Sequence, residues 1–259
     1  MLIDDRWELG PPIAKGSFGR VFYGTDTSGG PDVAIKLLHS DNVEAATRMA
    51  RAARKIAHLQ HPGIVPILAV TTYTRLTQTH PAVVMELVDT KRTVRDTIAS
   101  RQPLPLDEAV ELLQLVTGAV SHAHMNDVVH RDLKPENLLE DECGRPRIID
   151  FDLAKFTTST GATFTPTQVA IQMGSPPYSA PELTNAATAT PAVDLYSLGV
   201  IFAELLTGTP TPTEARLDAL PAEATQLIRD LVCPLDERIK NADELASRLA
   251  QLEQVGKAA

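Results

Sequence analysis

The sequence predicts an α+β fold in two parts, a small part of antiparallel strands with one long helix and a larger part that is mostly helical. Up to Asp89, short apolar segments rich in β-branched residues are separated by turns. Beyond Asp89, apolar residues recur at helical spacing. The chain has 259 residues, of which 43% are hydrophobic. This is enough to bury a large core, in one domain or in two lobes.

Charge and cysteine content restrict the classes of function. The formal net charge is −9, so the chain has no electrostatic reason to bind nucleic acid or an anionic membrane. Two cysteines, Cys143 and Cys233, are too few for a disulfide framework and indicate a reducing compartment. The N-terminus does not resemble a signal peptide, and no window approaches the ~18 apolar residues of a membrane span. We therefore expect a cytoplasmic protein.

Residues 7–24 are expected to form two strands joined by a turn that contains Gly16 and Gly19. Glycines let a backbone approach phosphate oxygens closely. For this segment alone, an ordinary hairpin turn is the simpler explanation. The next predicted strand, 32–38, carries Lys36 in its middle. Such a lysine is usually solvated, but below a glycine loop it can reach the phosphates of a nucleotide.

The rest of the first part is predicted to contain one helix and two strands. Residues 43–60 have apolar residues near helical spacing, and Pro62 follows the expected end of the helix. Residues 64–70 and 81–88 are predicted strands, separated by a threonine-rich loop.

Four helices are predicted in the second part, near residues 107–123, 191–207, 222–232 and 242–253. Asp107 and Thr190 are the expected N-caps of the first two, and Gly208 is the expected end of the second. The second of these helices is apolar on nearly every face, which predicts burial. A short strand at 146–149 leads to Asp150, and residues 153–179 are expected to form a long functional loop.

The octet 130–137 combines an acid, a base and an amide in eight positions. Asp132 is followed by Lys134, and Asn137 comes three residues after the lysine. Apolar residues flank the octet at both ends, namely Val128, Val129, Leu138 and Leu139. We expect a loop that the core holds at both ends and that keeps a carboxylate, a cation and a metal ligand in fixed geometry.

These segments together resemble the eukaryotic-type (Hanks-type) protein kinases of the Ser/Thr branch. The resemblance covers residues 7–249 and rests on these motifs in order: Gly16…Gly19…Val21, Val33-Ala34-Ile35-Lys36, His130-Arg131-Asp132…Asn137, Asp150-Phe151, Ala180-Pro181-Glu182, Asp194…Gly199 and Arg238. It implies a bilobal protein-kinase-like fold. A single protein kinase domain would cover residues 1–259, with a β-rich lobe over 1–88 and a helical lobe over 89–259. It further indicates a soluble bacterial member of the family.

The resemblance implies transfer of the ATP γ-phosphoryl group to a Ser/Thr hydroxyl of a protein substrate. Positioning and charge neutralisation dominate such a reaction. The implied catalytic residues are Asp132 as base, Lys134 at the γ-phosphate and Lys36 at the α- and β-phosphates, together with Asn137. Asn137 and Asp150 would hold Mg²⁺, with Mn²⁺ as the alternative metal. The implied nucleotide-binding residues are Ile13, Ala14, Lys15, Gly16, Ser17, Phe18, Gly19, Val21, Ala34, Lys36, Glu86, Val88, Leu139 and Asp150.

Other residues receive structural or regulatory roles from the same resemblance. Glu182 and Arg238 would form a buried ion pair, and Asp194 would hold the catalytic loop by accepting backbone hydrogen bonds. Arg131 implies pairing with a phosphorylated residue of the long loop. The candidates for autophosphorylation, which would involve self-association, are Thr163, Thr165 and Thr167. The alternative is a loop that only happens to contain many threonines.

The sequence departs from the family pattern at four places. Ala14 stands where the glycine loop usually begins with glycine. Ala52 stands where a glutamate usually pairs with Lys36, and Asp152 replaces the glycine after Asp150-Phe151. The segment 209–221 is shorter than the substrate-docking segment of the family.

These departures keep a second class of function open, a pseudokinase that acts as a nucleotide-binding scaffold or allosteric partner. The catalytic lysines, the octet and Asp150 favour an active protein kinase, because chains that lose catalysis commonly lose one of these residues. A kinase of small molecules is a third alternative, and Lys134 and the segment 180–182 argue against it.

Overall fold

The computed structural model describes residues 1–16, 19–38, 51, 53–75, 78–90, 92–151, 177–184 and 190–258. Its contacts divide the chain into two compact units. Among the described residues, the first unit comprises 1–61 and 65–89 and contains the sheet. The second comprises 62–64 and 90–258 and contains the helices named below.

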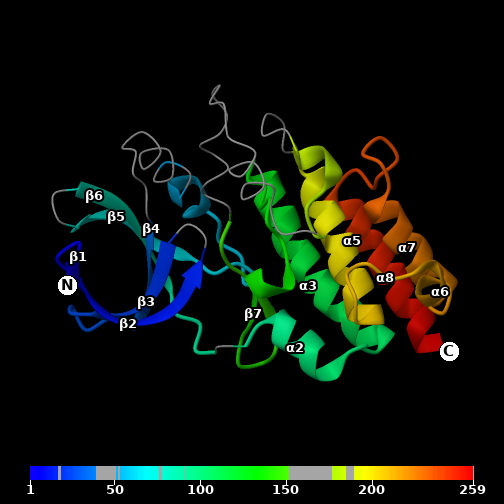
Figure 1. The fold of residues 1–259 in the computed structure, drawn as a ribbon, viewed down its shortest axis with the longest axis horizontal. Helices are drawn as coiled ribbons and strands as arrows, with labels where there is room; N and C mark the ends of the chain where they lie inside the picture. Colours follow the sequence, from blue (N-terminus) through cyan, green and yellow to red (C-terminus); the bar gives the residue numbers. More distant parts are fainter. Residues whose placement is uncertain are drawn as a thin grey trace. The chain divides into compact units, whose positions relative to one another are not determined.

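The first unit is a six-stranded antiparallel sheet in the order β1-β2-β3-β4-β6-β5 (Figure 1). Its strands are β1 (Leu2–Ile3), β2 (Trp7–Gly16), β3 (Gly19–Asp26), β4 (Val33–Leu38), β5 (Ile67–Arg75) and β6 (Gln78–Glu86). The chain also makes a helical turn at residues 53–56. An antiparallel sheet with a helix in this unit agrees with the predicted α+β class.

The core of the first unit lies on one face of the sheet. On β4, Val33, Ile35 and Leu37 point to this face and join a buried cluster with Trp7 and Val84. The side chains of a strand alternate between its two faces, so Ala34 and Lys36 lie on the opposite face. All six residues of β4 are buried, which explains why this strand reads as almost continuously apolar.

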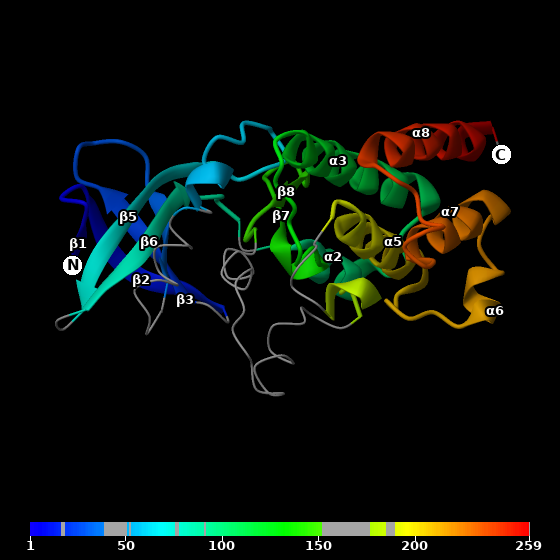
Figure 2. The ribbon, with the colours of Figure 1, turned by 90° about the horizontal axis from the view of Figure 1, so that it is seen from above.

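The second unit is mainly helical. Its elements are α2 (Val94–Arg101), α3 (Leu106–Met125), η1 (Pro135–Asn137), β7 (Leu138–Glu140), β8 (Pro146–Ile148), η3 (Pro181–Thr184), α5 (Ala192–Thr207), α6 (Glu214–Leu217), α7 (Ala222–Val232) and α8 (Ala242–Ala258). Figure 2 shows α8 running beside α3, and α7 beside α5. Strands β7 and β8 pair antiparallel.

Helix α5 forms the centre of the second unit. Leu195, Leu198, Ile201 and Phe202 are each 0% exposed. The prediction that this helix is apolar all round and therefore buried is confirmed. Gly208 ends it with φ of 75°, a left-handed conformation that glycine adopts at little cost.

Several predicted boundaries are confirmed and others are wrong. The predicted helix 222–232 coincides with α7, and the strand predicted at 146–149 is β8. The described residues of the threonine-rich loop predicted between two strands, 71–75 and 78–80, belong instead to β5 and β6, which pair there. Threonine is β-branched and suits a pleated sheet, so its high frequency here favours strand rather than loop.

The two predicted N-caps are also wrong. Helix α3 begins with Leu106 after Pro105, which puts Asp107 in its first turn. Helix α5 begins after Pro191 and has no side-chain cap hydrogen bond, so Thr190 is not its cap. A carboxylate in a first turn still favours the helix electrostatically, as Asp107 does.

Some of the predicted residues lie outside the described part of the chain. They are Ser17, Phe18, Ala52, Asp152, Thr163, Thr165 and Thr167. Within the described ranges, no helix is both long and apolar enough to cross a membrane.

Candidate active site

The octet 130–137 is held in the second unit by buried residues at both ends and in its middle. Val128 before it is 1% exposed, Leu138 after it is 0% exposed, and Leu133 within it is also 0% exposed. The 3-10 turn η1 closes the octet, where Asn137 N–H donates to the Lys134 carbonyl at 2.9 Å. The predicted loop pinned by the core is confirmed.

Two polar side chains of the octet meet at the carboxylate of Asp132. Lys134 Nζ donates to Asp132 Oδ2 at 2.8 Å, and Asn137 Nδ2 donates to the same oxygen at 3.2 Å. Asn137 Nδ2 also donates to the backbone oxygen of Asp132 at 2.7 Å. Oδ2 of Asp132 is therefore held by two donors, and this fixes the direction in which Oδ1 points.

Asn137 and Asp150 have the chemistry of a ligand pair for a hard cation. The amide nitrogen of Asn137 is bonded to Asp132, so its oxygen is the end left for a metal. Ile149 N–H donates to the Asn137 carbonyl at 3.0 Å, which brings the residue before Asp150 to Asn137. An amide oxygen and a carboxylate suit Mg²⁺. The described residues contain no cluster of three or more His, Cys, Asp or Glu that could hold a metal.

Asp194 supports the octet from α5. It is 0% exposed, and its carboxylate accepts the backbone N–H groups of His130 and Arg131, each at 2.8 Å. The predicted role of Asp194 is thus confirmed. Its other contact is the ring of His124 at 2.8 Å. Burial alone would raise the pKa of Asp194, but the hydrogen bond and charge of His124, the charge of His130 and the backbone N–H of Arg131 lower it below its ordinary value.

Two residues near Asp194 and the octet, Arg131 and Asp150, have an unusual backbone conformation. Arg131 has φ of 70° and Asp150 has φ of 57°, a left-handed region that is costly for residues other than glycine. His130 links the two positions, because its Nε2 lies 2.9 Å from the Ile149 carbonyl and its ring packs 4.7 Å from that of Phe151. The strain is held by buried contacts next to the candidate catalytic and metal residues.

The predicted ion pair in the helical unit is present. Arg238, whose side chain is 1% exposed, pairs with Glu182, whose side chain is 22% exposed. Arg238 also donates to the carbonyls of Cys233 and Ala192. Burial alone would raise the pKa of Glu182, but the hydrogen bond from Arg238 lowers it. Arg238, in the segment between α7 and α8, thus connects η3 to the start of α5 through Glu182 and the Ala192 carbonyl.

In the first unit, several predicted nucleotide-binding residues share one face of the sheet. Val21 is paired with both Ala14 and Lys36, and antiparallel partners point to the same face. Ala34 lies on this face as well, two residues from Lys36. Lys36 is only 8% exposed, so the alternative of a solvated surface lysine is wrong.

Two predicted nucleotide contacts have additional structural roles. A Cβ at Gly19 would lie 2.2 Å from the carbonyl oxygen of Leu37, so the close approach of β4 requires glycine there whatever the loop binds. The N–H of Glu86 donates to the Pro66 carbonyl at 3.1 Å. Among the backbone groups of residues 86–88, the N–H of Glu86 is therefore already hydrogen-bonded within the protein and is not a free donor for adenine.

Sequence reasoning missed a polar cluster around Arg95 of α2. Arg95 donates to Glu204 of α5 at 2.6 Å and to Glu136 of the octet at 2.7 Å. Tyr178 bonds to both Arg95 and Glu204. Burial alone would lower the pKa of Arg95, but these partners raise it. The available signal was Glu204 itself, an acidic residue late in a helix predicted to be buried.

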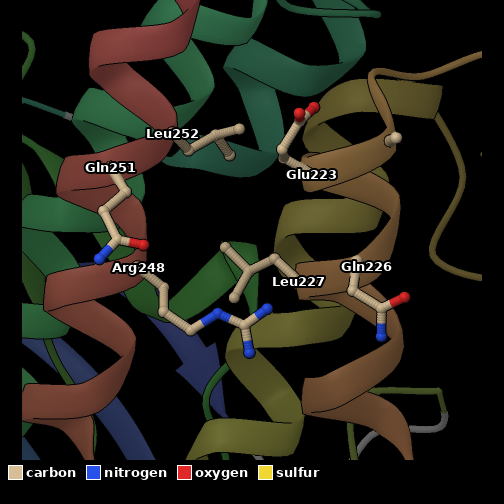
Figure 3. Close-up of a pocket in the computed structure, with 7 residues that line it drawn as sticks. Glu223, Gln226, Leu227, Arg248, Gln251 and Leu252 are labelled. Carbon is tan, nitrogen blue, oxygen red and sulfur yellow. The ribbon is translucent and has the colours of Figure 1, made fainter.

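A hollow of ≈ 490 Å³ between α7 and α8 is separate from these residues (Figure 3). Its lining consists of Ala222, Glu223, Gln226, Leu227, Arg248, Gln251 and Leu252. None of them is a predicted site residue. Arg248 is paired with Asp230 at 2.6 Å.

Comparison with known proteins identifies the family. A family model for the protein kinase domain matches residues 7–254. The chain therefore belongs to the protein kinase family. The kinase domain of PknI from Mycobacterium tuberculosis has the same fold, with a TM-score of 0.75 at 21% identity over 97% of this chain and 98% of that one. The predicted bilobal kinase fold is thus confirmed.

The curated relatives are bacterial and belong to the predicted Ser/Thr branch. The chain is 37% identical to probable serine/threonine-protein kinase PknB of Lactococcus lactis over 79% of its own length and 32% of that protein. It is 34% identical to serine/threonine-protein kinase PrkC of Bacillus subtilis over 80% of its own length and 31% of that protein. It is thus a Hanks-type kinase domain of bacterial type, and it spans about a third of the length of these relatives.

Proposed function

We propose that the protein is an ATP-dependent serine/threonine protein kinase. The observation that carries the proposal is the junction of Lys134 and Asn137 at one oxygen of Asp132. It supplies a carboxylate of fixed direction, a cation two residues away and an amide oxygen suited to a metal. Phosphoryl transfer needs positioning and charge neutralisation more than covalent chemistry by the protein, and this arrangement offers both.

Each polar residue of the octet has its own role in phosphoryl transfer. Because Oδ2 of Asp132 is occupied by two donors, Oδ1 is the oxygen that orients a substrate hydroxyl and accepts its proton. Lys134 neutralises charge on the group being transferred. Asn137 Oδ1 and Asp150 hold the metal. When bound there, Mg²⁺ neutralises phosphate charge, and Mn²⁺ is the alternative, since both ions prefer oxygen ligands.

The nucleotide contacts are assigned to the first unit, together with Leu139 and Asp150 of the second. Lys36 binds the α- and β-phosphates, and the backbone of the β2–β3 turn approaches the phosphates. Val21, Ala34 and Leu139 contact the adenine ring. The other proposed nucleotide-binding residues are Ile13, Ala14, Lys15, Gly16, Ser17, Phe18, Gly19, Glu86 and Val88. The shared sheet face of Val21, Ala34 and Lys36 supports this assignment.

The proposed substrates are proteins with an accessible serine or threonine, and a second copy of the chain is one of them. Autophosphorylation is proposed at Thr163, Thr165 or Thr167, with Arg131 as the partner of the phosphate. Residues 1–259 are proposed to form one kinase domain, with lobes over 1–88 and 89–259. Two unpaired cysteines support a reducing, cytoplasmic setting.

The pseudokinase alternative rests on Ala52 and Asp152. It is not supported over the active kinase, because the matched relatives are serine/threonine-protein kinases by name and the residues of the octet are intact.

The test compares the wild-type protein with Asp132→Asn and with Asp127→Asn as a matched control. Asp127 is an exposed carboxylate five residues away. Each protein is incubated with labelled ATP, a basic protein substrate and either Mg²⁺ or Mn²⁺. We expect Asp132→Asn to lose about 10²- to 10⁴-fold of the transfer rate, as for removal of a general base, and Asp127→Asn to retain it. Absence of transfer in the wild type, or equal rates with Asp132→Asn, would contradict the proposal.

The same samples test autophosphorylation. Mass spectrometry of their digests should find phosphate in the 153–179 segment of the wild type and none with Asp132→Asn. Equal phosphate in both would show that another kinase supplies it.

A further inference from the structure

The proposed metal ligand Asn137 lies in a short segment, 136–140, with an acidic residue at each end. Glu136 precedes Asn137 and Glu140 ends β7. Glu136 is bonded to the side chain of Arg95 in α2. Glu140 is bonded to the side chains of Thr97 in α2 and of Arg92, the residue before the N-cap of α2. Helix α2 therefore contacts the segment on both sides of the metal ligand.

The first tie joins Glu136 to Arg95. The two residues are 41 positions apart, and Arg95 Nε lies 2.7 Å from Glu136 Oε1. Arg95 cannot move freely toward or away from Glu136, because its other nitrogens bond to Glu204 and Tyr178. Glu204 is 3% exposed. The octet is thus connected through Arg95 to the centre of the helical unit.

The second tie joins Glu140 to Thr97 and Arg92. Thr97 Oγ1 donates to Glu140 Oε1 at 2.5 Å, and Arg92 Nε lies 2.9 Å from Glu140 Oε2. Arg92 also donates to Thr97 Oγ1, and its carbonyl accepts the Glu140 N–H at 3.0 Å. Glu140 is 7% exposed and Thr97 5%. Burying a carboxylate to this extent costs free energy unless it is hydrogen-bonded or paired with a charge. Glu140 therefore favours the one arrangement in which it contacts both Thr97 and Arg92.

Helix α2 is itself well anchored. Thr93 and Asp96 form a reciprocal capping box at its start. Val94 and Ile98 are 0% and 2% exposed. Its N-cap residue, Thr93, makes an isolated β-bridge with Leu139. The helix can therefore serve as a fixed reference for the segment that it holds.

We propose that α2 is the positioning element of the metal-ligand segment, with Arg95 holding its start and Thr97 and Arg92 holding its end. The inference rests on the proposed function, because it concerns the same metal site. None of the three residues touches the metal or the substrate in this scheme. They restrict the backbone of residues 136–140, so that Asn137 Oδ1 needs no reordering when a cation binds. Partners that orient metal ligands typically change metal affinity by roughly 10- to 100-fold.

The principal test replaces Thr97 with valine, which keeps its shape and removes the hydroxyl. Thr97→Ser is the rescue variant, since it restores the donor. Thr225→Val is the matched control, because Thr225 of α7 is also buried and its hydroxyl donates to the Leu217 carbonyl of α6 at 2.6 Å. If Thr97 were merely structural, the two valine variants would behave alike.

Two measurements are made on each variant. The first is hydrogen exchange of residues 136–141 in the protein without nucleotide. The second is the Mg²⁺ concentration that half-saturates binding of a non-hydrolysable ATP analogue. For Thr97→Val we expect faster exchange in this segment and a Mg²⁺ requirement roughly tenfold higher, at the low end for residues that orient ligands. Thr97→Ser and Thr225→Val should match the wild type in both. Wild-type behaviour of Thr97→Val, or equal shifts with Thr225→Val, would overturn the proposal.

A second pair of variants tests the other tie and covers the case in which Thr97→Val does not fold. Glu136→Gln removes the charge that bonds to Arg95, and Glu108→Gln removes the charge of an exposed partner of Arg101, also on α2. Faster exchange of 136–141 with Glu136→Gln alone supports the proposal, whereas no change, or the same change with both, counts against it. Exchange is measured without nucleotide, so it decides this point even if the wild type transfers no phosphate and the proposed function fails.

Discussion

Replacing Asp194 with asparagine is the most informative perturbation of this fold. The buried carboxylate of Asp194 uses Oδ1 for the Arg131 N–H and Oδ2 for the His130 N–H and for His124. Asparagine has the same shape but only one acceptor oxygen. In either orientation of the amide, its NH₂ group faces the backbone N–H of His130 or of Arg131. That backbone N–H then loses its acceptor on residue 194.

The magnitude follows from these three bonds. With the amide oxygen in the Oδ2 position, the variant keeps the contacts of His130 and His124 and loses that of Arg131. Losing a hydrogen bond to a charged acceptor costs about 1.5–3 kcal/mol, and leaving a buried donor unsatisfied costs about 1–3 kcal/mol. We therefore expect the free energy of unfolding to fall by about 2.5–6 kcal/mol, a large part of the ~5–15 kcal/mol typical of a domain. Arg131, held at φ of 70°, should relax and reduce the transfer rate.

The assay is urea unfolding followed by far-ultraviolet circular dichroism. The one tryptophan, Trp7, lies in the sheet unit, so its fluorescence would not report on the helical unit that contains Asp194. Asp230→Asn is the control, because its ion pair with Arg248 is about 30% exposed on both sides and should contribute at most about 1 kcal/mol. If Asp194→Asn lowers the free energy of unfolding no more than this control, the supporting role of Asp194 is wrong.

Two further predictions concern pH and packing. Glu182→Gln should lower the free energy of unfolding by about 3 kcal/mol near neutral pH, since it leaves Arg238 buried without its counter-ion. The fold lowers the pKa of Glu182, so this contribution is complete above the ordinary value of 4.5 and is lost as pH falls below it. Urea unfolding at about pH 7 and about pH 3.5 should show the gap closing, and a constant gap would argue against the ion pair. Gly199→Ala should cost about 1–3 kcal/mol, because its Cβ would lie 2.5 Å from that of Leu231. Gly118→Ala, with no heavy atom within 4 Å, should instead stabilise α3 by about 0.5–1 kcal/mol, and a melting-temperature comparison that gave both the same sign would refute this packing argument.

The elements that sequence predicted well are those whose pattern is strong and local. Helix α7 has the predicted bounds, because its apolar stripe begins and ends sharply. The β5–β6 hairpin was misjudged because threonine occurs in both loops and strands, and only pairing across the hairpin separates the two. The caps of α3 and α5 were misjudged because a capping residue is defined by backbone angles, which composition does not fix.

For the candidate site, the sequence by itself determined which groups are present and which of them meet within the octet. Asp132, Lys134 and Asn137 are at most five residues apart, so one short loop brings them together. Tertiary structure alone decided what holds that loop. Thr97 reaches Glu140 across 43 positions, His124 reaches Asp194 across 70, and Arg95 reaches Glu204 across 109. A buried polar group takes the partner that packing places beside it, and no local spacing encodes which helix that will be.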